Sequence, residues 1–245
     1  MHEKPFFCGI LRDCCIAWRL NMAVMELKNV QYTYKTQYQE NNVLKGVTHS
    51  FEAGAVHAIM GKSGSGKTTL LSLMAGLDLP TAGEVLCEGE STAQMNLEQY
   101  RREKVAVIYQ SFRLFPLLTA TENVMYPMEL CGVRPAEAKK RAVELLEKVG
   151  LSKEMMDRFP TMLSGGEQQR VAIARAFGMD THVLLADEPT GNLDDANGEQ
   201  VMDILIRLAH ETDRCVVVVT HDQELASRAD TVVYMHDGIL CEQKP

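Results

Sequence analysis

Hydrophobic and polar positions alternate along the early part of the chain in the manner of half-buried strands. Residues 25–34 and 43–52 carry this alternation, with a polar turn between them, and predict an antiparallel pair. A short apolar run at 55–60 predicts a buried strand, and a helical apolar run at 68–75 follows, with Gly76 placed to end the helix. The pattern therefore predicts an antiparallel opening followed by a strand, a loop and a helix.

A helical pattern replaces the strands in the middle of the chain, at about 111–167. Residues 137–149 place their apolar side chains on one helical face. Strands return at 183–186 and 216–220, with an amphipathic helix near 198–209 between them. Because buried strands that alternate with helices pair in parallel, we expect a parallel sheet covered by helices, with the middle segment as a helical insertion.

Two short apolar runs end the chain, at 232–235 and 239–241. They flank Asp237-Gly238, a dipeptide typical of a two-residue β-hairpin turn. The sequence contains no internal repeat and no low-complexity segment, and its length predicts one domain with an inserted subdomain.

Composition narrows the functional classes. The chain has 245 residues, of which 46% are hydrophobic, which is enough for a full core. Its net charge of −8 disfavours a broad basic face for nucleic acid or anionic lipid. Seven cysteines at spacings unlike those of metal ligands are typical of a reducing compartment, so we expect a cytoplasmic protein. No apolar run reaches the length of a membrane span, so a role at a membrane would depend on a partner.

Residues 1–22 stand apart from the rest of the chain. They are too mixed for a secretory signal, and Met22 and Met25 could each be the true start. Two interpretations stay open for this extension: an upstream start codon or disordered tail, and a functional arm.

The loop after the strand at 55–60 carries the pattern Gly61-x-x-x-x-Gly66-Lys67-Thr68 of a P-loop. Glycines there let backbone N–H groups face phosphates at the positive end of the following helix. Lys67 is expected to reach the outer phosphates of ATP, and the Thr68 hydroxyl to bind Mg²⁺. The predicted nucleotide-contacting residues of this loop are Gly61, Lys62, Ser63, Gly64, Ser65, Gly66, Lys67, Thr68 and Thr69.

The apolar strand at 183–186 ends in two carboxylates, Asp187 and Glu188. A carboxylate in this position beside a P-loop is typical of a Mg²⁺ ligand, which we predict for Asp187. Glu188 is then placed to orient and polarise the attacking water. Without the P-loop, the same pair would indicate only solvated charge after a strand.

Ser164-Gly165-Gly166-Glu167 opens a predicted helix. Ser164 and Glu167 form a capping box, which explains two of the four residues. It does not explain two successive glycines, which weaken a helix start by about 1 kcal/mol each unless something approaches the backbone closely. A phosphate would suit this helix N-terminus, but the P-loop already surrounds the phosphates on one side. We therefore expect the segment to complete the site from a second copy of the protein.

Together these strings resemble the nucleotide-binding subunit of an ATP-binding cassette (ABC) transporter, over about residues 25–242. The resemblance implies an α/β fold of the P-loop NTPase type, with a RecA-like core, an antiparallel β subdomain and an inserted helical subdomain. The boundaries it implies are an extension at 1–22 and an ATPase domain at 23–245, with the core at about 23–110 and 168–245 and the helical subdomain at about 111–167.

The resemblance also assigns roles to residues outside the P-loop. The string 164–167 matches the family's signature motif, which meets the partner's P-loop in a head-to-tail dimer around two ATP molecules. Gln110 resembles the glutamine that contacts Mg²⁺ and water and reports to the permease, and His221 resembles the histidine that contacts the γ-phosphate. Residues 192–194 resemble the loop that crosses the dimer interface. The expected catalytic residues are thus Glu188, His221, Gln110 and Lys67, and the expected metal ligands Thr68, Gln110 and Asp187.

Tyr34 occupies the position of an aromatic residue that stacks on adenine in the family. Tyr32 and Tyr38 lie close by, and alternation points Tyr32 and Tyr34 to the same face. Any of the three could instead be an ordinary strand aromatic.

An apolar cluster with a proline follows Gln110, at residues 111–118. Two interpretations stay open here: a small core of the helical insertion, and a groove for a short cytoplasmic helix of a membrane partner.

The strings at 76–83 and 186–194 are similar to the branch of macrolide exporters, lipoprotein-releasing complexes, peptide-resistance systems and the division-associated ATPase. This implies an ATPase peripheral at the inner face of the cell membrane, with an integral membrane permease as partner, that drives export of a peptide, an antibiotic or a lipid-linked substrate. An ATP-gated scaffold of the cell-division type is the alternative. Glu167 departs from the glutamine of many relatives.

Overall fold

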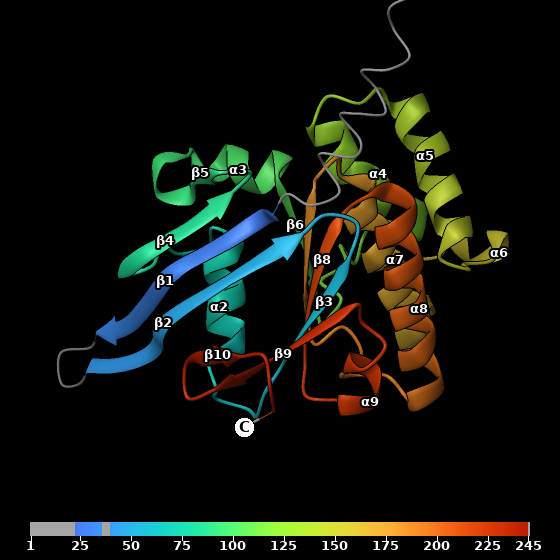
Figure 1. Ribbon diagram of the computed structural model, residues 1–245. Coiled ribbons are helices and arrows are strands. Elements are labelled where there is room, and N and C mark those ends of the chain that lie inside the picture. Colours follow the sequence, from blue (N-terminus) through green and yellow to red (C-terminus); the bar gives the residue numbers. More distant parts are fainter. Residues whose placement is uncertain (1–22, 36–39, 245) are drawn as a thin grey trace, which may run out of the picture.

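The structure of the protein is a computed structural model that describes residues 23–35 and 40–244, which contain two β-sheets flanked by helices (Figure 1). The expectations for the extension at 1–22 lie outside the described residues. The antiparallel sheet has the order β2-β1-β4-β5. Its strands are β1 (Ala23–Lys35), β2 (Glu40–Glu52), β4 (Ala82–Cys87) and β5 (Glu90–Ser91).

The second sheet has the order β10-β9-β3-β8-β7-β6, and every pairing in it is parallel except that of β10 with β9. Its strands are β3 (Val56–Met60), β6 (Val105–Tyr109), β7 (Val183–Asp187), β8 (Cys215–Thr220), β9 (Thr231–His236) and β10 (Ile239–Cys241). The strands predicted at 183–186 and 216–220 are therefore present, and the sheet is parallel as the alternation of strands and helices predicted.

Helices cover both faces of the parallel sheet. They are α2 (Lys67–Met74), α3 (Leu97–Glu103), α4 (Ala120–Leu130), α5 (Pro135–Lys148), α6 (Lys153–Met156), α7 (Gly165–Gly178), α8 (Asp195–Thr212) and α9 (Gln223–Ala226), with short 3₁₀ turns at Thr92–Gln94 and Pro160–Met162. The helix predicted at 198–209 is longer at both ends, because Asp194 caps it and a left-handed Asp213 ends it.

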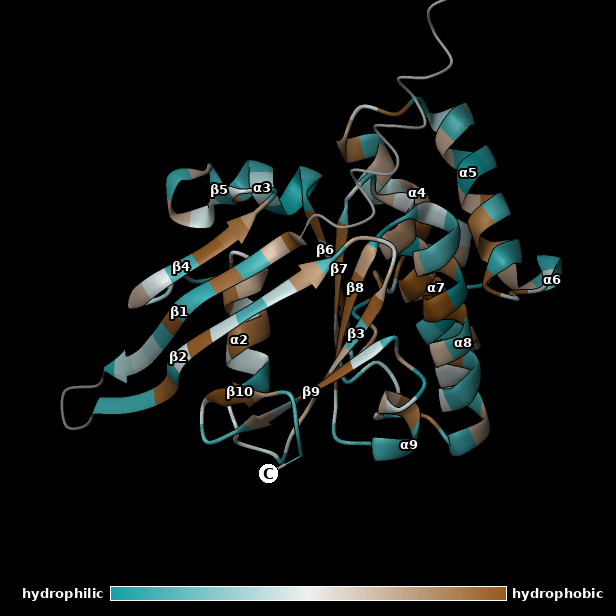
Figure 2. Ribbon diagram, in the orientation of Figure 1, coloured by the Kyte–Doolittle hydropathy of each residue, from teal (hydrophilic) through white to brown (hydrophobic). Residues whose placement is uncertain are grey.

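Two hydrophobic clusters share the parallel sheet, because successive strand residues face opposite sides. Leu184 and Ala186 of β7 pack with α7, α8 and the helical insertion, whereas Val183 and Leu185 pack with α2 and the antiparallel sheet. Figure 2 shows the brown apolar strands of this sheet enclosed between α2 on one side and α7 and α8 on the other. The core therefore holds β3, β8 and β7 in a fixed relation to α2.

The turns that were predicted from glycine are present in the structure. Gly76 has φ 62° directly after α2. Asp237 and Gly238 both have positive φ, at 46° and 79°, in the hairpin between β9 and β10. These left-handed positions end each element where the sequence pattern placed the end.

The stretch from 111 to 167 is mainly helical and contains α4, α5 and α6. A capping box of Thr119 and Glu122 begins α4, which carries Pro127 in its interior. No helix in the described part of the chain is both long and apolar enough to cross a bilayer.

Candidate functional site

Four strand ends meet at one edge of the parallel sheet. The register pairs Met60 with Thr220, and Asp187 with both Val219 and Tyr109. The carboxyl ends of β3, β8, β7 and β6 are therefore level with one another, and ligands of open α/β sheets bind outside such ends. The residues that follow them are Gly61, His221, Glu188 and Gln110.

The loop between β3 and α2 leaves the N-terminus of the helix without a side-chain cap. Gly66 caps α2 in a left-handed conformation with φ 106°, without a side-chain cap and without an acidic residue in the first turn. Lys67 is buried, and its Nζ donates to the carbonyl oxygens of Gly61 at 2.7 Å and Lys62 at 3.1 Å. Among the residues that the structure describes, none is a hydrogen-bond partner of the buried Ser65 hydroxyl. An uncapped helix N-terminus with a lysine folded into the loop suits a triphosphate, which would supply the missing acceptors.

Thr68 and Asp187 face one another beside this loop. The Thr68 hydroxyl donates to Oδ1 of Asp187 at 3.4 Å. Burial raises the pKa of the Asp187 carboxyl above its usual range, and the neighbouring Glu188 raises it further, against the opposing effect of Thr68. A half-buried carboxylate with an unmet need for positive charge, next to a hydroxyl, suits a hard cation such as Mg²⁺.

No cluster of three or more His, Cys, Asp and Glu side chains placed to hold a metal is found in the residues that the structure describes. A cation bound by Thr68 and Asp187 would therefore take most of its oxygen ligands from water and phosphate, as Mg²⁺ usually does.

Glu188 and His221 form a hydrogen-bonded pair in front of the sheet. Nδ1 of His221 lies 2.7 Å from Oε2 of Glu188, although 33 residues separate them. Glu188 has a left-handed backbone with φ 47°, and its N–H donates to the carbonyl of Val219 at 2.9 Å. This arrangement turns the carboxylate away from the strand direction and towards the histidine, where it can orient a water molecule.

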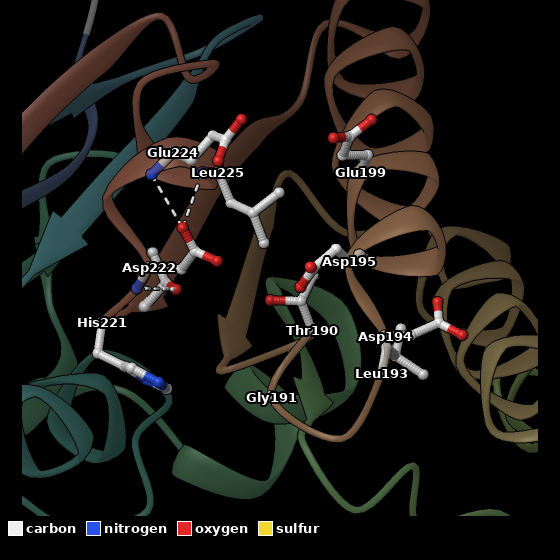
Figure 3. Close-up of a pocket in the computed structure, with 12 residues that line it drawn as sticks. Thr190, Gly191, Leu193, Asp194, Asp195, Glu199, His221, Asp222, Glu224 and Leu225 are labelled. Carbon is white, nitrogen blue, oxygen red and sulfur yellow. Dashed lines mark hydrogen bonds between the residues drawn. The ribbon is translucent and has the colours of Figure 1, made fainter.

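The turn after β8 fixes His221. Asp222 caps α9 by accepting from the backbone N–H groups of Glu224 at 2.8 Å and Leu225 at 3.2 Å. Figure 3 shows His221 at one end of a cleft, with Thr190 and Asp195 across from Asp222. The histidine therefore lies in a short, capped turn and not in a long loop.

Gln110 is held by the loop after Glu188. Its Nε2 donates to Oδ1 of Asn192 at 3.2 Å, and Nδ2 of Asn192 donates to the backbone carbonyl of Gln110 at 3.0 Å. Asn192 had been assigned only to a dimer interface, and no local sequence pattern reveals this reciprocal pair. The structure thus gathers Lys67, Thr68, Gln110, Asp187, Glu188 and His221 at one edge of the sheet.

The segment 164–167 has a different character. Oε2 of Glu167 accepts from the N–H and the hydroxyl of Ser164 at 2.7 and 2.8 Å, and the Ser164 hydroxyl accepts from the N–H of Glu167 at 3.4 Å. The N–H of Ser164 lowers the pKa of Glu167, with a further contribution from the hydroxyl. The capping box is therefore present, and it satisfies the N–H groups of Ser164 and Glu167.

The two glycines of this segment differ. A Cβ on Gly166 would lie 2.6 Å from Oδ1 of Asn197, so close packing against α8 explains its glycine within one chain. A Cβ on Gly165 would lie no closer than 3.6 Å to Leu193, which is ordinary contact. The sequence interpretation assigned both glycines to an approaching ligand. Packing is a sufficient reason for glycine at position 166. At position 165 the described residues give no such reason.

Tyr34 lies on the antiparallel sheet and is 49% exposed, whereas Tyr32 is buried. The rings meet edge to face with centroids 4.9 Å apart, on the shared face that alternation predicted. Tyr32 pairs with Leu44 of β2, and a Cβ on Gly66 would lie 3.0 Å from that leucine. This end of β1 is therefore next to the P-loop, where an exposed ring could meet a nucleobase.

The comparisons with known proteins agree with this geometry. The family model described as ABC transporter matches residues 44–191. The chain is 41% identical, over 90% of its length and 98% of the other, to the lipoprotein-releasing system ATP-binding protein LolD of Legionella pneumophila (strain Paris). It is 42% identical, over 88% of its length and 94% of the other, to an uncharacterized ABC transporter ATP-binding protein, MJ0796, of Methanocaldococcus jannaschii.

A solved structure is similar in fold as well as in sequence. The dimeric post-hydrolysis state of the ATP-binding cassette MJ0796 bound to ADP and Pi superposes with a TM-score of 0.81 at 39% identity. The match covers 90% of this chain and 99% of that one. The predicted fold class is therefore confirmed.

Proposed function

The chain belongs to the ATP-binding subunits of ABC transporters and is an ABC-type ATPase, and from that premise we propose that two copies close head to tail around two Mg-ATP to drive a membrane permease. The observation that carries the proposal is the division of the site. Lys67, Asp187, Glu188 and His221 converge within one chain, whereas Ser164 and Glu167 at the start of α7 bond to one another.

Each convergent residue has a role that follows from its position. Lys67 exchanges the carbonyls of its own loop for phosphate oxygens. Bound Mg²⁺ would neutralise charge that develops on the phosphates, held by Thr68 and Asp187. Glu188 orients the attacking water, and His221 keeps that carboxylate in place. Gln110 reports on the site through its bond to Asn192.

In this proposal the partner's signature segment, residues 164–167, completes the side of the nucleotide site that one chain does not supply. Gly165 is the position at which a phosphate could approach the backbone, because no atom in the described part of its own chain requires a glycine there. The MJ0796 cassette, which is similar over most of the chain, is dimeric in a nucleotide-bound structure. That likeness supports a dimeric arrangement for this chain.

A mixing experiment tests the division of the site. Glu188→Gln disables hydrolysis on the P-loop side, and Gly165→Asp places a repelling carboxylate on the signature side. Aspartate in the first turn favours the helix, and a Cβ on Gly165 meets its neighbours only at ordinary contact distances, so the second variant is expected to fold. Each variant alone should be inactive in ATP hydrolysis.

When the subunits are mixed before ATP is added, an equal mixture should recover about a quarter of the wild-type rate, because half of the random dimers contain one intact site of two. The matched control is a double variant that carries both substitutions in one chain, mixed with wild type. It should leave about a quarter of the rate, because mixed dimers then contain no intact shared site, whereas simple dilution of sites within one chain would leave about half. A mixture that stays as inactive as its components would show that each site lies within one chain and would refute the proposal.

An apolar groove supports the permease as partner. It is bordered by Leu77, Phe115, Tyr126 and Leu130, which are 53%, 44%, 39% and 61% exposed. Grooves of this kind receive amphipathic helices. The segment 112–113 beside it is tied to α7, because Arg175 donates to the carbonyls of Phe112 at 2.9 Å and Arg113 at 2.6 Å. A helix in the groove would therefore act on the signature helix.

The direction and cargo of transport form the finer part of the proposal. The similarity to lipoprotein-releasing ATP-binding proteins supports export of a lipid-linked, peptide or antibiotic substrate from the inner face of the membrane. The test is the ATPase rate of the subunit co-purified with its permease, measured with compounds of each class. Stimulation by one class identifies the cargo, whereas a rate that none of them changes favours the scaffold.

A further inference from the structure

The loop after α2 is fastened to strand β1. The backbone N–H and the hydroxyl of Thr81 both donate to the carbonyl of Gln31, at 2.9 and 3.1 Å. Gly83 packs so closely that a Cβ there would lie 2.1 Å from the carbonyl oxygen of Asn29. The hydroxyl of Tyr32 donates to Oδ2 of Asp78. Residues 76–83, whose sequence is similar to one branch of the family, thus form a bracket that holds the strand carrying Tyr34.

The same bracket begins at a rigid helix end. The N–H of Leu77 donates to the carbonyl of Ser72 at 3.0 Å, and the N–H of Gly76 to that of Leu73 at 3.0 Å. With Gly76 at φ 62°, these bonds form a Schellman motif that ends α2. Asp78 follows at once, and its Oδ1 accepts from the N–H of Leu79 at 2.8 Å. The position of Asp78 is therefore set by the helix whose other end is the P-loop.

Tyr32 links that aspartate to Tyr34. Its ring is buried and meets the exposed ring of Tyr34 edge to face, at an interplanar angle of 83°. The hydrogen bond to Asp78 raises the pKa of Tyr32 to about 12, so the hydroxyl stays protonated and remains a donor at neutral pH. An edge-to-face neighbour restricts the orientation of an exposed ring, which otherwise has free rotamers on the surface.

We propose that Tyr32 and Asp78 are positioning residues for the nucleobase: they hold Tyr34 at a set place relative to the phosphate-binding helix, so that one ATP reaches both. The inference rests on the proposed function in one respect, since it takes Tyr34 as the residue that stacks on adenine. In this arrangement α2 and the loop that follows it connect the base platform to the P-loop. Loss of the tether loosens the platform without disturbing the phosphate site.

The experiment measures how much of the affinity depends on the base. ATP and inorganic triphosphate each displace a fluorescent nucleotide from the purified subunit, and the dissociation constant of triphosphate divided by that of ATP isolates the contribution of adenosine. Tyr34→Ala should lower this ratio by about tenfold, the scale of one lost base–aromatic stack. Tyr32→Phe and Asp78→Ala should each lower it by about threefold, because the rings remain and only their restraint is lost.

Two further readouts separate positioning from general support. The Tyr32→Phe and Asp78→Ala effects should not add to one another, and both should disappear in a Tyr34→Ala background, because all three act through one contact. The KM for ATP should rise while kcat stays within about twofold. The matched control is Thr48→Val in β2, which removes a hydroxyl that accepts from the N–H of Asn29 at 3.0 Å. Asn29 lies on β1, the strand that also carries Tyr32 and Tyr34. This control should reduce thermal stability and leave the ratio unchanged.

The variants distinguish the role of Tyr32 and Asp78 as a tether from the assignment of Tyr34 to the base. If Tyr34→Ala leaves the ratio unchanged, Tyr34 does not contact the base, and the inference fails together with that assignment. If Tyr34→Ala lowers the ratio but Tyr32→Phe weakens ATP and triphosphate equally, the tether is merely structural and the inference alone is overturned.

Discussion

Two helix N-termini of this molecule are lined by glycine, and they are prepared in opposite ways. Helix α2 begins at a left-handed Gly66 without a side-chain cap, so its first N–H groups have no acceptor from a capping side chain. Helix α7 begins with Ser164 and Glu167 in a complete capping box. An uncapped N-terminus in a folded protein is costly unless a ligand serves it, whereas a capped one keeps its shape unaided.

The carboxylates beside the two helices differ in the same sense. Burial raises the pKa of Asp187 near α2, so its charge lacks compensation in the protein alone. The N–H of Ser164 lowers the pKa of Glu167 at α7, so its charge is already satisfied. The comparison indicates that the edge near α2 is built to receive a ligand and a cation. The start of α7 instead holds its shape through its capping box, as the proposed contact with a partner subunit requires.

The largest effect is expected from removing the lysine side chain at the start of α2. Lys67→Ala should weaken ATP binding by about 100-fold and abolish hydrolysis, because a charge-assisted contact to the phosphates is lost. Titration with fluorescent ATP and a phosphate-release assay measure the two quantities. Lys139→Ala, on the exposed face of α5, is the matched control and should change neither. Normal hydrolysis by Lys67→Ala would contradict the role of α2 as the phosphate site.

Removing the water-orienting carboxylate should separate binding from chemistry. Glu188→Gln keeps the shape of the side chain and loses its charge, so hydrolysis should slow by about 1,000-fold while ATP still binds. Because α7 needs no change to meet the nucleotide, the bound state should accumulate as a closed dimer. Size-exclusion chromatography with ATP and Mg²⁺ detects it. A monomeric Glu188→Gln protein with full activity would exclude both the catalytic role and the closed dimer.

The two glycines of α7 give a smaller and more selective effect. Gly166→Ala should lower the free energy of unfolding by about 1 kcal/mol, since the new methyl group displaces Asn197 from its bond to Asp194. Gly165→Ala should fold as well as wild type or gain up to about 1 kcal/mol from helix propensity, yet should weaken the ATP-dependent dimer. Urea denaturation and size-exclusion measure the two properties.

Asn197→Ala supplies the control for this pair. Added to Gly166→Ala, it removes the overlapping amide and should restore the lost stability, whereas it has nothing to relieve at Gly165. If both glycine variants fold normally and both dimerise with ATP, neither position faces a ligand, and the proposed contact of α7 with a partner subunit is wrong.

How far the sequence predicts this molecule also differs between its regions. The P-loop, the carboxylate at the end of β7 and the hairpin at Asp237-Gly238 were all predictable, because each depends on residues adjacent in the chain. Strand β4 and helix α3 were not predicted. The apolar part of β4 is short, and α3 buries only Tyr100. Local patterns of this length are too weak to decide between strand, helix and loop.

The contacts within the site were less predictable than its members. The bond between His221 and Glu188 spans 33 residues, and that between Gln110 and Asn192 spans 82. The approach of Asn197 to Gly166 likewise depends on how α8 packs against α7. Such pairs are decided by sheet register and helix packing, so a single sequence names the residues without showing which of them meet.

The smallest effects test the opposite electrostatics of the two regions, in the protein without nucleotide. Asp187 has a higher pKa folded than unfolded, so its ionised form destabilises the fold once the pH rises through that raised value. Glu167 has a lower pKa folded than unfolded, so its ionised form stabilises the fold until the pH falls through that lowered value. At neutral pH both groups are ionised, and the two contributions have opposite signs.

Neutral amides should therefore shift stability in opposite directions. At neutral pH, Asp187→Asn should raise Tm by about 2 °C and Glu167→Gln should lower it by about 1 °C, and both differences should shrink as the pH falls towards the range where the carboxyl groups protonate. Thermal unfolding across acidic to neutral pH measures them. Each variant controls for the other, because both exchange a carboxylate for an amide of the same shape. A shift of the same sign in both would mean that the two helix ends are not prepared differently. Removing a charge stabilises the folded protein only where that charge is uncompensated.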